Sequence, residues 1–544
     1  MTAMHTTISE AHVAAVKKSE KPINNAHFKK LLDKNVEPGN ASPTSKESEA
    51  CAKWARDTMP RMEETVKKAG CNPFNIDAQD VLLDLLTDSG TSRLAASQKR
   101  LKKAWEAAVP DHQNFAYAGL PARASLDAVV ADIFGAQFYF QPTLQGRSSE
   151  FLLLKSMVDA GAIGKGDVIL SNRPFDTTKG HINNVLIEVV ACTKLTTPDV
   201  YANSADVFLG NMPFDTMKAE HGKAQGKAKA VLMTLTDNGG GGQPVSMENV
   251  RKAAEFANEN GLLVWIDACR IFENAFYIKL FEKGYELKTL PEIVREILSY
   301  ADVATLSFKK MYSHTGGAVF LNRESAKIAP RIEAMKTSMQ ETSTVLYGMS
   351  YPKGYCGLNG DKMVEIISGI HLAIDPEVIG SRIAQVKKSG AVMAKYGAPV
   401  VPGAHADYLA ADRWLPNVPL EKEPAEYLQA ILLASLGIRG CGLGNRLYGK
   451  WEETKGAYKL KVPAEMDSMR LAIPRLAYSD AFLSQTLEIA ARAYAEGVFS
   501  KASGGLSPAN YNDRGFYHFG GCHQIRNEAE FSGMVQEVRE IARA

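Results

Sequence analysis

The chain has 544 residues, of which 45% are hydrophobic and 23% charged, and this composition is typical of globular proteins and excludes a disordered or collagen-like chain. With 63 Lys and Arg against 61 Asp and Glu, the formal charge is +2, so no global excess of charge draws the protein to nucleic acid or to an anionic membrane. The seven cysteines are scattered and contain no CxxC pair, which favours a reducing compartment over a disulfide framework.

The first sixty residues differ in composition from the rest of the chain. Residues 1–25 lack the apolar core of a signal peptide, and no run of about 18 apolar residues occurs in the sequence, so we expect a cytoplasmic protein without a membrane segment. Residues 1–59 are polar and poor in aromatic side chains, and we expect them to form a poorly ordered extension. An apolar cluster that begins near Asn72 marks the start of the folded part.

Apolar runs of strand length alternate with helical segments in the middle of the chain. Strands are predicted at 228–236, 262–266 and 303–308, and helices at 245–260 and 290–299. Repeated strand-helix-strand order predicts parallel strands joined by right-handed crossovers. The sequence therefore predicts an α/β fold.

Polar side chains follow each of the three predicted strands. They are Asp237 and Asn238 after the first strand, Asp267 to Arg270 after the second, and Lys309 and Lys310 after the third. Each set alone could be an ordinary solvated strand end, but ligands of open α/β sheets bind beyond the carboxyl ends of the strands, so three consecutive sets favour a site. The glycine run 239–242 lacks phosphate-loop spacing, which favours a flexible turn or close approach to a flat ligand.

An aspartate and a lysine at neighbouring strand ends are the pair that pyridoxal phosphate requires. A lysine amine holds this cofactor as an imine, and a carboxylate beside the pyridine nitrogen keeps that nitrogen protonated, so that the ring accepts electrons. The cofactor's phosphate needs backbone N–H groups and an arginine, and Gly146 and Arg147 offer both where the segment Thr143 to Glu150 enters a predicted helix.

Segments in this order resemble the β-eliminating lyases, the family of the tryptophanases and tyrosine phenol-lyases. The resemblance covers about residue 60 to the C-terminus and is carried by NPF with LLTDSGT, AYAG, QGR, FDTTKGH, GGQPVSM, DACRIFENAFYIK, SFKK followed by GG, RLAIPR and a late HF. It implies the fold of aspartate aminotransferase, known as pyridoxal phosphate fold type I, with a mainly parallel seven-stranded sheet in a large domain and a smaller α/β domain. It also implies a small amino-acid substrate, no nucleic-acid or membrane partner, and a homotetramer whose subunits share active sites.

The same resemblance divides the chain after the extension 1–59. Residues 60–102 would begin the small domain and connect it to the large domain at 103–362, which binds the cofactor. Residues 363–488 would form the small C-terminal domain, and 489–544 would return to the active site.

Cofactor contacts follow from the resemblance where residues match. Lys310 matches the imine-forming lysine, which also removes the α-proton, and Asp267 matches the partner of the pyridine nitrogen. The remaining cofactor residues are implied to be Arg270 and Asn238 near the phenolic oxygen, Gln145, Gly146, Arg147 and Ser307 around the phosphate, and Phe175 stacked on the ring.

Residues that bind or protonate the substrate are implied in the same way. Arg470, the first arginine of RLAIPR, matches the residue that binds the α-carboxylate through two parallel hydrogen bonds. Thr87 and Ser89 of the TDSG turn match polar groups around that carboxylate. Tyr117, in FAYAG, matches the acid that protonates the ring carbon of the leaving group.

Substrate choice depends on three positions. Asp176 follows Phe175 as in tryptophanases, whereas phenol-lyases carry Thr there, and a carboxylate can interact with an indole N–H. His518, in YHFGG, matches the family histidine that could order this network. Leu443 stands where phenol-lyases place an arginine for the phenol oxygen. Together these residues favour an indole ring.

Departures from the family pattern leave some properties open. Asn114 and Phe115 replace an Asp-Glu pair whose glutamate binds an activating monovalent cation, so dependence on potassium stays open. Gly442 replaces an acidic residue near the substrate ring, which leaves room for a substituted tryptophan. His518, Cys522 and His523 offer metal-binding side chains on one short loop only, so we do not expect a metal there.

The sequence therefore predicts a pyridoxal phosphate-dependent carbon–carbon lyase that converts tryptophan, or a ring-substituted tryptophan, to an indole, pyruvate and ammonia. Two alternative activities are a tyrosine phenol-lyase and a general cysteine or serine β-eliminase. The remaining alternative is a catalytically silent pyridoxal phosphate-binding protein.

Overall fold

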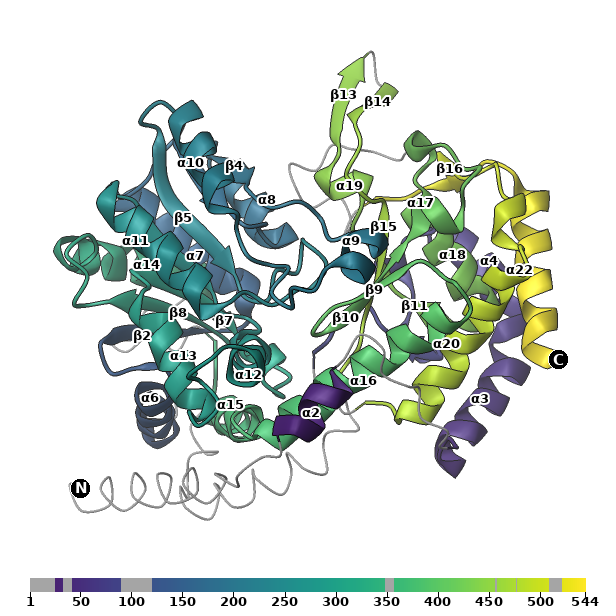
Figure 1. The fold of residues 1–544 in the computed structure, drawn as a ribbon, viewed down its shortest axis with the longest axis horizontal. Coiled ribbons are helices and arrows are strands. Elements are labelled where there is room, and N and C mark those ends of the chain that lie inside the picture. The colour runs from purple at the N-terminus through teal and green to yellow at the C-terminus, as the bar shows by residue number, and fades with distance from the viewer. Residues whose placement is uncertain are drawn as a thin grey trace. The chain divides into compact units, whose positions relative to one another are not determined.

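The computed structural model describes residues 25–32, 42–89, 120–347, 357–454, 457–475, 477–507 and 521–544 (Figure 1). The chain divides into two compact units. The large unit is Met1–Lys29, Ser89–Thr193 and Val207–Ser381, and the small unit is Lys30–Asp88, Lys194–Asp206 and Arg382–Ala544. Because each unit is assembled from separated stretches, contacts between residues far apart in the sequence build both of them.

A seven-stranded sheet forms the centre of the large unit. Its strand order is β2-β8-β7-β6-β5-β3-β4, and only β8 runs antiparallel to its neighbours. The strands are β2 (Phe138–Thr143), β3 (Val168–Ser171), β4 (Glu188–Ala191), β5 (Ala228–Thr234), β6 (Leu263–Asp267), β7 (Val303–Ser307) and β8 (Gly317–Asn322). This mainly parallel sheet confirms the predicted α/β fold.

Helices cover both faces of this sheet. In β8, Val319 and Leu321 belong to the core cluster that contains the leucines of α7, whereas Phe320, between them, contacts Phe134 of α6 with ring centroids 5.6 Å apart. Alternate side chains of a strand point to opposite faces, so α7 and α6 lie on opposite sides of the sheet.

The helices of the large unit are 7 to 16 residues long. They are α2 (Asn25–Leu31), α6 (Leu120–Phe134), α7 (Gly146–Asp159), α8 (Asp176–Asn184), α10 (Phe214–Lys223), α11 (Met247–Glu259), α12 (Ile271–Phe281), α13 (Leu290–Ser299), α14 (Ile332–Tyr347) and α15 (Gly360–Ala373). The predicted strands at 228–236, 262–266 and 303–308 correspond to β5, β6 and β7, and the predicted helices to α11 and α13. The boundaries differ by one or two residues. Strand β5 ends at Thr234, two residues before the predicted end, and Phe308 opens a 3-10 turn, Phe308–Lys310, that ends the third strand one residue earlier.

A four-stranded antiparallel sheet lies in the small unit, in the order β12-β15-β10-β9. Its strands are β9 (Val400–Pro402), β10 (Ala406–Ala410), β12 (Cys441–Gly442) and β15 (Ser468–Ala472). Three strand pairs complete the unit: β1 (Leu83–Asp84) with β11 (Ile438–Arg439), β13 (Lys450–Thr454) with β14 (Ala457–Val462), and β16 (Leu506–Ser507) with β17 (Gln524–Ile525).

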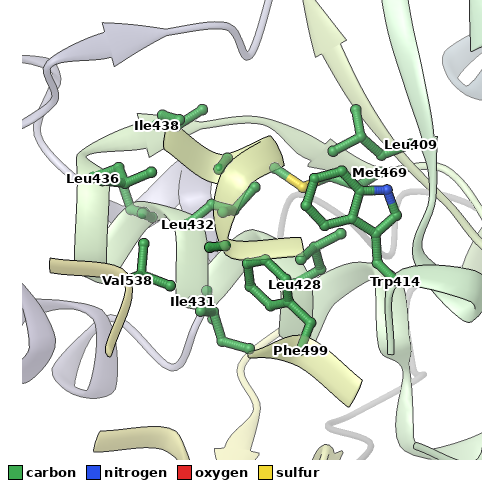
Figure 2. Packing of buried hydrophobic residues seen from close by; sticks show 14 of the residues in the cluster. Leu409, Trp414, Leu428, Ile431, Leu432, Leu436, Ile438, Met469, Phe499 and Val538 are labelled. Atoms are coloured by element: carbon green, nitrogen blue, oxygen red, sulfur yellow. The ribbon is translucent and has the colours of Figure 1, made fainter. Parts of the chain in front are cut away.

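Helix α18 (Pro424–Leu436) is the centre of the small unit's core, because every one of its residues is buried. Figure 2 shows its Leu428, Ile431 and Leu432 packed among apolar side chains that include Trp414 and Val538. The other helices of the unit are α3 (Ser45–Asp57), α4 (Met59–Lys68), α9 (Pro198–Asn203), α16 (Pro376–Lys395, which starts in the large unit), α17 (Ala411–Trp414), α19 (Asn445–Tyr448), α20 (Asp480–Ala495) and α22 (Glu528–Arg543). Among the described residues, no helix has both the length and the apolar character that a bilayer crossing requires.

Residues 45–57 differ from the expected poorly ordered extension, since they form helix α3. A capping box starts the helix: the backbone N–H of Glu47 donates to Thr44 Oγ1 at 3.3 Å, and the backbone N–H of Thr44 donates to Glu47 Oε2 at 2.9 Å. Trp54 is buried in the core of the small unit, where its indole N–H donates to the backbone oxygen of Asp80 at 2.9 Å. The composition of this segment is polar because only one side of the helix is buried.

Candidate active site

The three polar sets predicted at strand ends lie at one edge of the large sheet. Strands β5, β6 and β7 are neighbours, and Asp267, the last residue of β6, is paired with Thr234 of β5 and Thr305 of β7. Asp237 follows β5 by three residues, and Lys310 follows β7 by three residues. The carboxyl ends of these parallel strands therefore bring a carboxylate and a lysine to the same edge.

The two lysines after β7 have different neighbours. Lys310 is half-buried, and its Nζ donates to Ser89 Oγ at 3.2 Å. Lys309 Nζ instead donates to Gln145 Oε1 at 3.3 Å, and burial, together with the positive charge of Arg147, lowers the pKa of Lys309. The two amines lie on the same 3-10 turn but donate to different side chains, Lys310 to Ser89 and Lys309 to Gln145.

Asp267 is buried at the end of β6. Its Oδ1 accepts the backbone N–H of Cys269 at 3.1 Å. Burial raises the pKa of Asp267, and the hydrogen bonds from Cys269 and the positive charges of Arg270 and Lys310 oppose that rise. A buried carboxylate of this kind is the group that a protonated ring nitrogen would pair with.

The N-terminus of α7 lies against the end of β7. Gly146 is the first residue of α7, and a Cβ atom built on it would lie 2.7 Å from the Cβ of Ser307, so only glycine allows this approach. Gln145 precedes the helix and forms a bridge with Gly316, and Arg147 is exposed on the first turn. The predicted phosphate residues Gln145, Gly146, Arg147 and Ser307 therefore surround one helix N-terminus, which suits an anion.

These features fit pyridoxal phosphate. The space beside Gly146 that a Cβ would fill, the N–H groups of the first turn of α7 and the Ser307 hydroxyl suit its phosphate, and the buried Asp267 suits its ring nitrogen. The buried Arg270, whose backbone N–H donates to Leu235 O at 3.0 Å, opens α12 next to Asp267. Phe175 is half-buried directly before α8.

The glycine run after β5 forms a buried turn around Asp237. The backbone N–H of Gly240 donates to Asp237 Oδ1 at 3.0 Å, and a Cβ built on Gly240 would lie 2.1 Å from Asp237 Oδ2. Burial raises the pKa of Asp237 to about 7, although the charge of Arg173 opposes this. The glycines therefore allow the backbone to close around a carboxylate and fix the following Asn238, which is fully buried.

Glu150 is a buried acid of this region that sequence reasoning did not single out. Its Oε2 accepts the hydroxyl of Thr177 at 2.6 Å, one residue after the buried Asp176 that begins α8. Burial, then the negative charge of Asp267 and finally that of Asp176, raise the pKa of Glu150 to about 8. The sequence signal is a glutamate directly before the apolar run 151–154, on a helix that faces the sheet.

Arg470, the predicted carboxylate-binding residue, lies in β15 of the small unit. It is buried, pairs with Tyr408 of β10 and Cys441 of β12, and its Nη2 donates to the backbone oxygen of Leu86 at 3.3 Å. Thr87, also in the small unit, is the next residue along the chain from Leu86 and is exposed. Ser89 belongs to the large unit, where its hydroxyl contacts Lys310.

The second arginine of RLAIPR has a different environment. Arg475 is fully buried, and its Nη1 donates to Asp88 Oδ2 at 3.0 Å and also to the backbone oxygen of Asp88. This ion pair joins the segment after β15 to the TDSG turn within the small unit. Arg475 is therefore engaged in a buried ion pair within the small unit.

Leu443 directly follows β12 and is buried. Its backbone N–H donates to Ser468 O at 2.7 Å, which extends the pairing of β12 with β15. A Cβ built on the preceding Gly442 would lie 2.3 Å from Glu426 Oε1, so the carboxylate of α18 occupies the space next to this glycine.

Four of the residues named from the sequence lie outside the described residues: Tyr117, His518, Asn114 and Phe115. Cys522 is exposed and His523 is buried, with its Nδ1 2.7 Å from Glu423 Oε2. Within the described ranges, no group of three or more His, Cys, Asp or Glu side chains is arranged to hold a metal ion.

Comparisons with known proteins agree with this architecture. The family described as "Beta-eliminating lyase" matches residues 84–487. A tryptophanase of Hyphomonas neptunium is 33% identical over 441 residues, which cover 79% of this chain and 88% of that protein. A tyrosine phenol-lyase of Symbiobacterium sp. is 32% identical over 429 residues, which cover 78% of this chain and 86% of that protein. The matched length and identity confirm the resemblance seen in the sequence, and the chain belongs to the β-eliminating lyase family.

Proposed function

We propose that this lyase uses pyridoxal phosphate to cleave L-tryptophan, or a tryptophan with a substituent on its ring, to an indole, pyruvate and ammonia. The observation that carries the proposal is the arrangement at one sheet edge of Lys310, Asp267 and the close contact between Gly146 and Ser307. Family membership supports the lyase chemistry, and the residue types at positions 443 and 176 support the choice of tryptophan.

Bound pyridoxal phosphate supplies an aromatic ring that accepts the electron pair left when the α-proton of an amino acid is removed. Lys310 would hold the cofactor and then accept that proton at Nζ. Asp267 would keep the ring nitrogen protonated. Its burial strengthens the attraction between the carboxylate and the protonated nitrogen, because the surrounding dielectric constant is low. The first turn of α7 and Ser307 would bind the phosphate and so fix the ring relative to Lys310.

The substrate needs two further contacts. Arg470 would bind the α-carboxylate, for which a planar guanidinium gives two parallel hydrogen bonds. Tyr117 would donate its hydroxyl proton to the ring carbon of the leaving group, because an indole carbon does not leave as a free anion. General acids of this kind contribute about 10²- to 10⁴-fold to a rate.

The identity of the ring follows from Leu443 and Asp176. A buried leucine offers no charge to a phenol oxygen, whereas a buried carboxylate can accept the N–H of an indole. A tyrosine phenol-lyase is the second candidate, because relatives of that name share 32% identity with this chain.

An assay of three substrates tests the proposal. We expect indole release from L-tryptophan, little phenol from L-tyrosine, and pyruvate from S-alkylcysteines, whose leaving group needs no ring acid. Lys310→Ala should lower all activities by at least about 10³-fold, since both the anchor and the base are lost. Lys309→Ala is the matched control and should lose far less. Preferential release of phenol would overturn the choice of substrate, and a larger loss in Lys309→Ala would overturn the choice of lysine.

Tyr117→Phe separates the ring acid from the rest of the site. Removal of its hydroxyl should lower indole release by about 10²-fold or more while pyruvate release from S-alkylcysteine persists. Equal loss on both substrates would contradict the role of Tyr117.

The family resemblance also leads us to infer a cytoplasmic homotetramer with active sites shared between subunits. Sedimentation at several protein concentrations tests the oligomeric state. Assays in potassium and in sodium buffers test whether Asn114 and Phe115 abolish dependence on the cation.

A further inference from the structure

Three buried carboxyl groups form an acid cluster where helices α7 and α8 meet the end of strand β6. They are Glu150, which is 2% exposed, Asp176 at 4% and Asp267 at 2%. All three residues belong to the large unit, so the cluster is a feature of that unit alone. The proposed function gives roles to Asp267 and Asp176, and Glu150 is the member of the cluster that has none.

The strand register shows that Asp267 points toward α7. Leu232 of β5 and Trp265 of β6 belong to the core cluster that contains the leucines of α7. Side chains two residues apart on a strand share a face, so Thr234 and Asp267, which pair with each other, point to that same side. A polar layer therefore follows the apolar one at this end of the sheet, and Glu150 lies on α7 within one turn of the leucines.

Helix α8 is tied to the acid cluster by Thr177. The hydroxyl of Thr177 donates to Glu150 Oε2 at 2.6 Å, and its backbone N–H donates to Asp176 Oδ1 at 2.6 Å, so one residue contacts two of the three acids. Burial, and then the negative charges of Asp267 and Asp176, raise the pKa of Glu150 to about 8, although the hydrogen bond from Thr177 opposes this rise.

The three acids differ in the groups that favour a negative charge on them. Asp267 has the positive charges of Arg270 and Lys310 nearby. Asp176 stands on the first turn of α8, where the helix dipole favours an anion. Glu150 is held instead by a neutral hydroxyl, and within the described residues it forms no ion pair. Because buried carboxylates in one place repel one another, Glu150 is the acid that keeps a proton.

The other titratable groups around Glu150 do not supply the missing positive charge. Burial raises the pKa of the Cys269 thiol beside the end of β6, so this thiol is neutral. Burial also lowers the pKa of His181, on α8, to about 4, so its imidazole is neutral at pH 7. Arg147, one turn before Glu150 on α7, is exposed, and solvent screens its charge.

We propose that Glu150 is a positioning residue of the cofactor site, which keeps its proton at neutral pH and so leaves Asp267 as the charged acid that faces the ring nitrogen. The inference rests on the proposed function, because only the bound cofactor gives Asp267 a ring to face. Electrons that enter the ring lower the positive charge at its nitrogen. A second carboxylate behind Asp267 would oppose their entry, since charges interact strongly in a buried region of low dielectric constant. A neutral Glu150 avoids this opposition.

Infrared spectroscopy of the full-length protein tests the proton without turnover. A protonated carboxyl group has a C=O stretch that a carboxylate and an amide lack. The difference between the wild type and Glu150→Gln should show this band at pH 6.5 and lose it at pH 9, because Glu150 ionises between these values. The difference is required because other buried acids contribute to the band, such as Asp237, whose pKa burial raises to about 7. A difference without the band at pH 6.5 would overturn the inference.

Exchange of the α-proton tests the consequence for the site. L-alanine has no leaving group on its β-carbon, so loss of deuterium from α-deuterated L-alanine reports electron acceptance by the cofactor whatever ring the true substrate carries. In the wild-type holoenzyme the exchange rate should fall about tenfold from pH 7 to pH 9, since about a tenth of Glu150 keeps its proton one pH unit above its pKa. Glu150→Gln cannot ionise, so it should match the wild type at pH 7 and keep most of that rate at pH 9.

Thr177→Val is a second test that leaves the carboxyl group of Glu150 in place. It removes the hydroxyl that stabilises the carboxylate but keeps the backbone N–H that donates to Asp176, so the alkaline decline should move to higher pH by about one unit. Thr234→Val is the matched control, because its buried hydroxyl has no hydrogen-bond partner within the described residues. Its decline should stay at the wild-type pH. Equal shifts in the two variants would contradict the role of Glu150.

The outcomes separate the inference from the proposed function. If the infrared band titrates but exchange declines alike in the wild type and in Glu150→Gln, Glu150 has a structural role only and the inference is overturned. If L-tryptophan is not cleaved but exchange depends on Glu150 as expected, the inference stands and the proposed substrate is wrong. A protein that neither exchanges the α-proton nor absorbs visible light with the cofactor would overturn both.

Discussion

Glu150 in the large unit and Asp88 in the small unit both have carboxyl groups with almost no exposure, at 2% and 1%, but the charges that surround them differ. Asp88 contacts the guanidinium of the fully buried Arg475 at 3.0 Å. The charges around Glu150 are instead the carboxylates Asp267 and Asp176, and burial together with these charges raises the pKa of Glu150 to about 8.

The difference shows that burial alone does not fix the charge of a carboxyl group. In the small unit, the charge of Asp88 is balanced by Arg475, and the ion pair joins two segments of the chain. In the large unit, Glu150 keeps its proton near Asp267, the residue that would pair with the ring nitrogen of the cofactor. Strongly shifted acids next to reactive groups are typical of functional sites. A buried ion pair such as Asp88 with Arg475 is typical of a structural role.

Asp88→Asn is the strongest test of this comparison. It keeps the shape of the side chain but leaves the charge of Arg475 buried and uncompensated, so we expect the free energy of unfolding to fall by about 3–5 kcal/mol. Urea unfolding followed by tryptophan fluorescence measures this loss.

Asp199→Asn provides the control for that loss. Asp199 pairs with Arg413 in the same unit, but both side chains are exposed and solvent screens the pair, so the unfolding midpoint should hardly move. Similar losses in the two variants would mean that the buried pair has no special role.

Gly146→Ala adds a methyl group at the edge of the sheet and changes no charge. The added Cβ would lie 2.7 Å from the Cβ of Ser307, well below normal contact distance, so helix α7 or β7 must shift. We expect the dissociation constant of pyridoxal phosphate to rise by about 10- to 100-fold, measured by titration of the cofactor's visible absorbance.

Gly164→Ala is the matched glycine variant in the same unit, because no atom lies within 4 Å of its added Cβ. It should bind the cofactor like the wild type. Equal weakening in both variants would show that the close approach of α7 to β7 does not form the phosphate site.

The strand-end residues could be predicted because the signals that place them are local. Each apolar run at β5, β6 and β7 ends in a polar residue within three positions, and parallel pairing then brings Asp267 and Lys310 to one edge. The boundary errors are small, such as Phe308, since a 3-10 turn and a strand end have similar sequence patterns.

The rest of the site depends on contacts that no local pattern reveals. Glu150 is one acid at the start of an apolar helix, and its neighbours Thr177 and Asp267 come from segments that are distant in the sequence. Helix α3 was missed for a related reason, because Glu47 is held by Ser479, whose hydroxyl donates to its Oε2 at 2.7 Å across the sequence. Tertiary contacts of this kind override composition.

Glu150→Gln tests whether Glu150 is protonated in the folded protein, through the dependence of stability on pH. The pKa of Glu150 is about 8 in the folded protein, against an ordinary value of 4.5, so between these values the folded state keeps a proton that the unfolded chain has lost. The free energy of unfolding of the wild type therefore falls as pH rises through this window. Glutamine mimics the protonated acid and cannot ionise, so the variant should gain stability relative to the wild type by at least about 1 kcal/mol between pH 5 and pH 8.

Unfolding midpoints at pH 5, 6.5 and 8 measure this relative gain. Glu333→Gln, an exposed substitution in α14 of the same unit, is the control, and its difference from the wild type should not change with pH. A constant difference for Glu150→Gln would show that Glu150 is ionised in the folded state. In that case a cation would have to act on it as Arg475 acts on Asp88, and the contrast between the two units would disappear.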